Sequence, residues 1–322
     1  MIYGVIFVKT ILKQMIYSFT LGVVAPGLLF SGAENVVDKV PQEEQPVSPT
    51  YIPVLMSDGK LRAMELESYI SRVVLGEMPA SFGEDALKAQ AVAARTYTLR
   101  LIESGERHQG AVCTDFSCCQ TYLEPEDYLG TRGTQADLEK VFQAVQDTAG
   151  EVICYEDELI CATYFASAGG RTEAAQAVWG QEYPYLVSVS SPEESVYDGE
   201  RIAYTFEEFQ QCLGVTFRGG PETWFGVPKY TEGGGVEKLR IGDHSYSGVK
   251  LREIFGLRST VFDITMTEDR IIFETQGYGH RVGMSQYGAA AMAKDGSDYR
   301  QILAHYYPGT TLQRIDKIAD FG

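Results

Sequence analysis

Two adjoining helical patterns separated by a proline constrain the fold of this 322-residue chain more than any other feature. In "LESYISRVVLGEMP" the apolar side chains of Leu66, Ile70 and Val73 follow helical i, i+4, i+7 spacing. The second pattern, "SFGEDALKAQAVAARTYTLRLIES", is rich in alanine and continues to about Ser104. Pro79, which stands between them, has no amide hydrogen to donate within a helix. The sequence therefore predicts two helices that meet at a tight corner.

Glu77 occupies the next position on the apolar stripe of the first helix. A carboxyl group against an apolar surface is poorly solvated, so its neutral form is favoured and its pKa rises. That property suits a general acid that works near neutral pH. The alternative is an ordinary glutamate at a frayed helix end, either exposed or paired with an arginine. Ser81 and Glu84 have the spacing of a capping box for the second helix, which would leave Glu77 at an open corner.

The remainder of the chain mixes helical patterns with strand patterns. "YIPVLMSDGKLRAMEL" predicts two short strands around an Asp58-Gly59 turn. The segment 192–264 interrupts the motif-rich regions and carries the glycine-rich stretch "TEGGGVEKL". We therefore expect an α+β fold of mixed helices and antiparallel strands over residues 51–322, in which residues 192–264 form a smaller inserted lobe.

Composition narrows the class of protein. The chain is 44% hydrophobic and contains 20 tyrosines, which is typical of a globular protein with ample core material. Its formal net charge of −17 argues against the phosphate backbones of nucleic acids as partners.

Residues 1–31 are predicted to be a membrane anchor or a signal segment. Lys9 and Lys13 precede an almost uncharged run from Met15 to Phe30. That run is about 16 residues long, between the apolar core of a signal peptide and a full membrane span, so cleavage and retention both remain open. Lysines before such a run send the rest of the chain across the membrane. Residues 32–50 read as a flexible linker.

One histidine and three cysteines are spaced to bind a metal ion. These four ligands, enough for a tetrahedral Zn²⁺, are His108, Cys113, Cys118 and Cys119. Four protein ligands leave no open position, so the zinc would be structural and catalysis would need no cofactor. Free thiols and a Cys113–Cys119 disulfide are the alternatives, because an exported protein meets oxidants. Cys154 and Cys161 lie on opposite arms of a predicted hairpin, and Cys212 is expected in the core.

Several ordered stretches resemble the stage II sporulation protein D family, lytic transglycosylases of the bacterial cell wall. "YISRVVLGEMPASFGEDALKAQAVAARTYTL" is similar to the family signature. The other matching stretches are "VCTDFSCCQTY", "ATYFASAGGRTEAAQAVWG", "SGVKLREIFGLRSTVFDI" and "GYGHRVGMSQYGAAAMAKDG". Together they extend over roughly residues 50 to 310. The glutamate of the "GEMP" motif is the catalytic acid of the family, and it corresponds to Glu77. Some members have two cysteines and two histidines in the cysteine region, where Cys118 replaces a histidine.

The resemblance implies a chemistry that one carboxylate can perform. Most glycosidases need two carboxylates, one as acid and one to serve water or the anomeric carbon. A lytic transglycosylase cleaves after N-acetylmuramic acid, and the C6 hydroxyl of that sugar attacks its own anomeric carbon to form a 1,6-anhydro ring. Because the nucleophile is intramolecular, positioning replaces a second protein group. Glu77 would protonate the leaving oxygen and then accept the proton of the C6 hydroxyl.

Two glycine-containing stretches are candidates for substrate contact. In "FASAGGRTE" the glycines allow close backbone approach, and short polar groups suit sugar hydroxyls, although a plain hairpin turn is the alternative. In "GYGHRVGMSQYGA" a loop leads into a helix whose first amides are available to ligands, although the histidine could be purely structural. The candidate residues are Ser167, Gly169, Gly170, Thr172, Glu173, His280, Ser285 and Gln286.

The resemblance also implies a biological setting. The substrate would be peptidoglycan strands denuded of stem peptides, and the partners would be sporulation proteins P, an amidase, and M, a membrane scaffold. The protein would be membrane-anchored or secreted and would act in the wall space between mother cell and forespore during engulfment. The alternative function is a non-catalytic glycan-binding module or an amidase enhancer.

Overall fold

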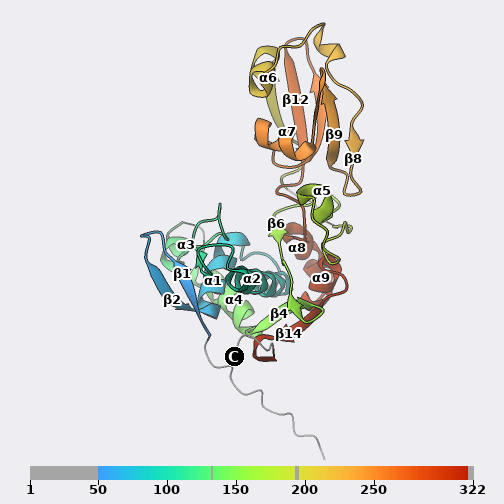
Figure 1. Ribbon diagram of the computed structural model, residues 1–322. Coiled ribbons are helices and arrows are strands. Elements are labelled where there is room, and N and C mark those ends of the chain that lie inside the picture. Colours follow the sequence, from blue (N-terminus) through green and yellow to red (C-terminus); the bar gives the residue numbers. More distant parts are fainter. Residues whose placement is uncertain (1–49, 132, 193–195, 318–322) are drawn as a thin grey trace, which may run out of the picture. The chain divides into compact units, whose positions relative to one another are not determined.

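The computed structural model describes residues 50–131, 133–192 and 196–317 (Figure 1). The predicted anchor at 1–31 and nearly all of the predicted linker at 32–50 lie outside these ranges. Within them, no helix combines the length and the apolar character that a membrane span requires. The fold is α+β, as predicted, and most of its strand pairings are antiparallel.

The predicted hairpin opens the described part of the chain. β1 (Tyr51–Leu55) and β2 (Leu61–Glu65) pair in antiparallel fashion, and β3 (Val112–Cys113) adds to β1 in parallel. Gly59 adopts a φ of +77° in the connecting turn, a conformation that costs glycine little because it has no Cβ. The hairpin delivers the chain directly into the first helix.

The two predicted helices are confirmed as α1 (Leu66–Glu77) and α2 (Glu84–Ser104). Leu66, Ile70 and Val73 are buried, as the stripe predicts. The predicted capping box is wrong, because α2 is capped by Gly83 without a side-chain hydrogen bond. Ser81 lies before that cap, in a turn closed by the Phe82 amide donating to the Pro79 carbonyl at 3.0 Å.

Helix α2 is the centre of the first hydrophobic core. It contacts α1, α4 (Gln135–Asp147), α8 (Gln286–Lys294) and α9 (Tyr299–Tyr306), and Figure 1 shows it between α1 and α9. Its many alanines permit these close contacts, since those at 86, 89, 91, 93 and 94 are all buried. α3 (Pro125–Thr131) packs on α1.

Two small sheets complete this part. β4 (Glu151–Tyr155) lies between β5 (Glu158–Leu159) and β14 (Thr311–Arg314). β6 (Tyr164–Phe165) pairs in parallel with β13 (Met284–Ser285), and α5 (Ala175–Trp179) follows β6. The β6–β13 pairing brings the two predicted substrate-binding stretches together, although more than a hundred residues separate them in the sequence.

A second hydrophobic core, yellow to orange in Figure 1, is rich in aromatic side chains. Its sheets have the orders β11-β12-β7 and β10-β9-β8. The elements are β7 (Glu200–Thr205), α6 (Phe206–Leu213), β8 (Lys229–Tyr230), β9 (Val236–Ile241), β10 (His244–Tyr246), α7 (Gly248–Phe255), β11 (Val261–Met266) and β12 (Arg270–Gln276). Phe209 stacks on Phe255 at its centre, with ring centroids 5.0 Å apart. The core includes β12, beyond the predicted limit of the lobe, and the limits 192–264 stay a prediction.

Candidate functional site

Glu77 is the last residue of α1, and local sequence explains its position. Met78 leaves the helix with extended dihedrals, because the residue before a proline is disfavoured in helical conformation. Gly76 lets another segment approach closely, since a Cβ there would lie only 2.7 Å from Cγ2 of Thr121. This approach brings the amide of Thr121 to within 2.8 Å of Glu77 Oε1.

The surroundings of Glu77 favour its protonated form. Burial raises the pKa of this carboxyl from its ordinary value of 4.5, and hydrogen bonds from Thr121 and Gln286 oppose the rise. The second bond runs from Gln286 Nε2 to Glu77 Oε2 at 3.3 Å. Across the described ranges, no lysine, arginine or histidine forms an ion pair with Glu77. The carboxyl can therefore hold a proton at a higher pH than an exposed glutamate.

Glu77 lines two cavities. The first, of about 410 Å³, is bounded mainly by apolar and aromatic side chains, among them Phe82, Tyr197 and Tyr287. The second, of about 290 Å³, is bounded by Tyr164, His280 and residues of the 107–120 loop. An extended ligand that passes the carboxyl would therefore have space on both sides of it.

The loop before α8 supplies the contact with the acid. Gln286 is the first residue of α8 and donates to Glu77, as described above. Ser285 caps the helix, because its Oγ accepts the Gly288 amide at 3.1 Å. Its hydroxyl is buried. The sequence prediction of ligand contact by these residues stays a prediction, but Gln286 lies directly beside Glu77.

His280 forms part of the wall of the second cavity. Its Nδ1 accepts the Val282 amide at 3.1 Å, and its ring lies 5.6 Å from the ring of Phe165 and 5.3 Å from that of Trp179. Burial, together with the positive charge of Arg252, lowers the pKa of His280 to about 4. The imidazole is therefore neutral near pH 7 and does not compete with a protonated Glu77 as an acid.

The "FASAGGRTE" stretch is largely internal. Ser167, Thr172 and Glu173 are buried, and Glu173 accepts hydrogen bonds from the Thr231 hydroxyl at 2.7 Å and the Gly235 amide at 3.0 Å. Gly169 and Gly170 have φ values of +65° and +100°, which glycine tolerates best. These contacts point to a structural role for the stretch, and its assignment to substrate binding stays a prediction.

Sequence reasoning missed Arg281, the buried partner of Glu173. Its Nη1 lies 3.2 Å from Glu173 Oε1, and its other nitrogens donate to the carbonyls of Ala168, Arg171 and Gly233 at 2.6–2.7 Å. It adopts a φ of +67°, which is uncommon for a residue with a Cβ. Arg281 thus joins three segments, and the glycine-rich stretch is needed because a Cβ on Gly233 would lie 2.5 Å from Thr172 O.

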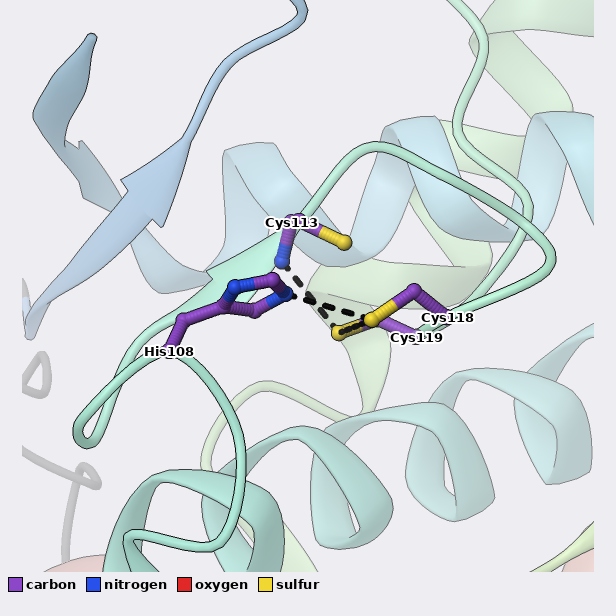
Figure 2. Close-up of side chains that lie close together, drawn as sticks. All are labelled: His108, Cys113, Cys118 and Cys119. Carbon is purple, nitrogen blue, oxygen red and sulfur yellow. Dashed lines mark hydrogen bonds between the residues drawn. The ribbon is translucent and has the colours of Figure 1, made fainter. Parts of the chain in front are cut away.

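The predicted metal ligands converge. Figure 2 shows the side chains of His108, Cys113, Cys118 and Cys119 pointing into one small volume, and their ligand atoms all lie within 4.8 Å of one another. Nε2 of His108 is 3.2 Å from Sγ of Cys118, which is 4.0 Å from Sγ of Cys119. A tetrahedral zinc with Zn–S bonds of about 2.3 Å has ligand–ligand edges of about 3.8 Å. The donor set and its spacing therefore fit zinc.

The backbone around the cluster is shaped to bring these groups together. His108 and Gln109 both have positive φ, 45° and 57°, ahead of Gly110, so the chain reverses sharply after α2. The amides of Cys118 and Cys119 both donate to the Asp115 carbonyl, which closes the loop between the cysteines. Burial raises the pKa of the Cys119 thiol, and a cation at the centre would reverse this effect because it stabilises thiolates.

Within the described residues, the other three cysteines belong to no group that could hold a metal ion. None of the six cysteines, all of which are described, forms a disulfide. Cys154 is buried in β4, whereas Cys212 is exposed near the end of α6, so its prediction as a core residue is wrong. Phe209 is the buried residue of this helix, whereas Cys212, three positions later and next to the C-terminal end, is exposed.

Comparison with known proteins gives consistent matches. A family model described as "SpoIID: Stage II sporulation protein" matches residues 57–155, a range that includes Glu77 and the cysteine cluster. The chain is 37% identical over 277 residues to stage II sporulation protein D of Bacillus subtilis (strain 168), covering 84% of this chain and 80% of the relative. The same protein of Bacillus amyloliquefaciens is 36% identical over equal shares. The amidase enhancer of Bacillus subtilis is 29% identical over 74% of this chain and 39% of the relative.

Proposed function

Because this chain belongs to the stage II sporulation protein D family, we propose that it is a lytic transglycosylase of peptidoglycan glycan strands. The family predicted from the ordered motifs is confirmed by these relatives. The observation that supports the activity most is the carboxyl of Glu77, whose pKa is raised by burial and which lies between two cavities.

In the proposed reaction the carboxyl of Glu77 acts twice, first as an acid and then as a base. Protonated Glu77 donates to the glycosidic oxygen that follows N-acetylmuramic acid, and the bond from that oxygen to the anomeric carbon breaks. The C6 hydroxyl of the same sugar attacks the anomeric carbon, and its proton passes to the Glu77 carboxylate. The products are a 1,6-anhydro end and a free hydroxyl on the leaving sugar, and no water is consumed. Gln286 and the Thr121 amide hold the carboxyl in place at each stage.

Asp137 is the other carboxylate among the residues that line these two cavities. It belongs to the capping box of α4, where its Oδ2 accepts from the amide and the hydroxyl of Thr134, both at 2.8 Å. These hydrogen bonds lower the pKa of Asp137. A capping carboxylate is committed to the helix terminus, so we assign it no step in the reaction.

The four-ligand cluster is proposed to hold a structural zinc. His108, Cys113, Cys118 and Cys119 would complete its tetrahedron, so the metal would offer no position to substrate. Its contribution would be to the folding of the loop that they close, since the free energy of metal binding becomes free energy of folding. That loop bounds the second cavity beside Glu77.

The biological setting is also a proposal. The names of the relatives, sporulation protein D and amidase enhancer, support a role in sporulation alongside an amidase. We propose that the substrate strands are first stripped of stem peptides by sporulation protein P, and that protein M is the membrane scaffold. Residues 1–31 would anchor or export the protein to the wall space between mother cell and forespore.

Product analysis tests the proposed activity. Purified protein is incubated with peptide-free glycan strands, and the new ends are identified by mass spectrometry. Anhydromuramic ends are the expected result. Ordinary reducing ends would mean a hydrolase, for which Asp137→Asn is the next variant to test. Intact strands would instead support the alternative of a glycan-binding module or an amidase enhancer, which the 29% identical amidase enhancer favours.

A further inference from the structure

The two cavities that meet at Glu77 differ in charge. Among the described residues that line the first cavity, Asp137 is a second carboxylate, and the nearby Lys140 ammonium donates to the Ala80 and Phe82 carbonyls of the same wall. The second is lined by the guanidinium of Arg107, and its histidine, His280, is neutral near pH 7. A ligand that spans both cavities therefore meets opposite charges, Asp137 and Lys140, on one side of Glu77 and the positive charge of Arg107 on the other.

Most of the N–H donors of Arg107 are available to a ligand. It is half-buried at the beginning of the 107–120 loop, and its Nη1 donates a long hydrogen bond of 3.8 Å to Sγ of Cys118. Among the residues described, it forms no ion pair with an aspartate or glutamate. A guanidinium has five N–H donors in a planar fork that matches a carboxylate. Arg107 is thus placed to bind an anionic group that enters the second cavity.

Phe116 lines the same cavity, although 77% of its surface is exposed. The loop that carries it is fixed, because Asp115 Oδ1 accepts from the amide of Ser117 at 2.8 Å and from its hydroxyl at 2.7 Å. An exposed aromatic ring on an ordered loop is a common platform for a ligand with one apolar face and polar edges. The axial C–H face of a pyranose ring is such a surface.

We propose that the second cavity binds the N-acetylmuramic acid on the glycone side of the scissile bond, with Arg107 on its lactyl carboxylate and Phe116 against its ring. The inference rests on the proposed function for the identity of the strand. N-Acetylglucosamine, which has no carboxylate, then occupies the first cavity beside Asp137. In the reversed strand the lactyl carboxylate would lie away from Arg107, and the charge-assisted hydrogen bond would be lost. The position of Arg107 therefore favours one direction of the strand.

A binding measurement separates this role from a purely structural one. The Glu77→Gln variant is used because it is expected to bind without cleavage. It is titrated with a peptide-free muramic-acid tetrasaccharide and with the same ligand after its lactyl carboxylates are converted to amides. Adding Arg107→Ala is expected to weaken binding of the carboxylate ligand about tenfold, because a charge-assisted hydrogen bond is lost. Binding of the amide ligand is expected to change less than about twofold. Arg107→Lys should restore part of the preference, since the charge remains.

Matched variants control for charge and for folding. Arg100→Ala removes a positive charge from the exposed face of α2, outside both cavities, and should leave the preference unchanged. Phe116→Ala should weaken the binding of both ligands equally, and Phe116→Tyr should restore it. Tyr51→Ala removes a similarly exposed ring from β1 and should not change the binding of either ligand. Zinc content and melting temperature are measured for each variant.

The outcomes distinguish this proposal from the proposed function. If Arg107→Ala weakens the binding of both ligands equally, with unchanged zinc content and melting temperature, the assignment of Arg107 is wrong. If the carboxylate preference disappears in Arg107→Ala while the protein forms no anhydromuramic ends, the subsite is supported and the transglycosylase activity is wrong. If anhydromuramic ends form and Arg107→Ala changes the affinity for neither ligand, the activity is supported and the subsite is wrong.

Discussion

Helix α1 carries a carboxylate near each end, and the two carboxylates have opposite surroundings. Glu67, at the first turn, lies 2.9 Å from Nε of the fully buried Arg95 and accepts the Gly150 amide at 3.0 Å. Glu77, at the last turn, accepts from the neutral groups of Thr121 and Gln286. The first carboxylate is neutralised by a cation, and the second is left to change its protonation state.

The same contrast holds elsewhere in the molecule. Glu173 is buried like Glu67, and Arg281 supplies its cation. Burying a charge is costly unless it is paired and hydrogen-bonded, so a fold that buries carboxylates for structural purposes supplies arginines to them. A half-buried carboxyl without a cation does not help the fold in this way. The presence of Glu77 at the corner of two helices is better explained by chemistry than by stability.

The largest expected effect on stability comes from removing an arginine that pairs with a buried glutamate. Arg95→Met leaves Glu67 buried without its partner, and the free energy of unfolding should fall by about 3–5 kcal/mol. Urea denaturation followed by circular dichroism measures this change. Arg201→Ala is the matched control, since it breaks an exposed pair with Glu274 and should cost no more than about 1 kcal/mol. Equal losses in the two variants would contradict the claim that buried Glu67 depends on its cation more than exposed Glu274 does.

Metal removal is expected to release the loop beside Glu77 and to lower the stability of the folded protein. With free zinc at about 100 times its Kd, the zinc-loaded protein should be more stable than the chelated protein by about 2.7 kcal/mol. The purified protein should contain about one zinc per chain, Cys118→His should keep it, and Cys113→Ser should lose it. Elemental analysis and thermal melts measure these effects.

Cys212→Ser is the control for the metal experiments, because this thiol is exposed on α6 and lies outside the cluster. It should change neither zinc content nor melting temperature. A protein purified without chelators that contains no zinc, with a Cys113–Cys119 disulfide found by mass spectrometry, would rule out the metal site.

The smallest expected effect is a pH dependence of stability that Glu77 contributes. Because burial raises its folded-state pKa above 4.5, the native protein binds more protons than the unfolded chain in the range from pH 4.5 up to the raised value. The Glu77 contribution to stability is therefore fully present below pH 4.5 and is lost as the pH rises through that range. Glu77→Gln should remove this component, so the variant should melt slightly higher than wild type at neutral pH. A wild-type minus variant difference that does not depend on pH would contradict the raised pKa.

Local patterns predicted the helices and the cysteine cluster well, for a physical reason. The stripe of Leu66, Ile70 and Val73 and the four metal ligands each lie within a short segment, so spacing along the chain determines spacing in the structure. The capping box failed because the turn after Pro79 extends two residues past Ser81, so the cap is Gly83.

Contacts between distant segments could not be predicted from such local patterns. Gln286 reaches Glu77 across 209 positions, and Arg281 reaches Glu173 across 108. An unpaired acid in one glycine-rich motif and an unpaired arginine in another were the available signal for the second pair. Nothing in the sequence indicated that Thr121 would supply the amide to Glu77, because that contact depends on the room left by Gly76.

The most direct test of the central claim, that Glu77 is the proton donor, is the cleavage rate of Glu77→Gln on peptide-free glycan strands. Glutamine keeps the size and hydrogen bonding of the side chain but cannot transfer a proton. Loss of about 10²–10⁴-fold in rate is expected, with the Kd for the strand unchanged and the melting temperature not lowered. Residual activity above a tenth of the wild-type rate, with anhydromuramic ends still forming, would contradict the account.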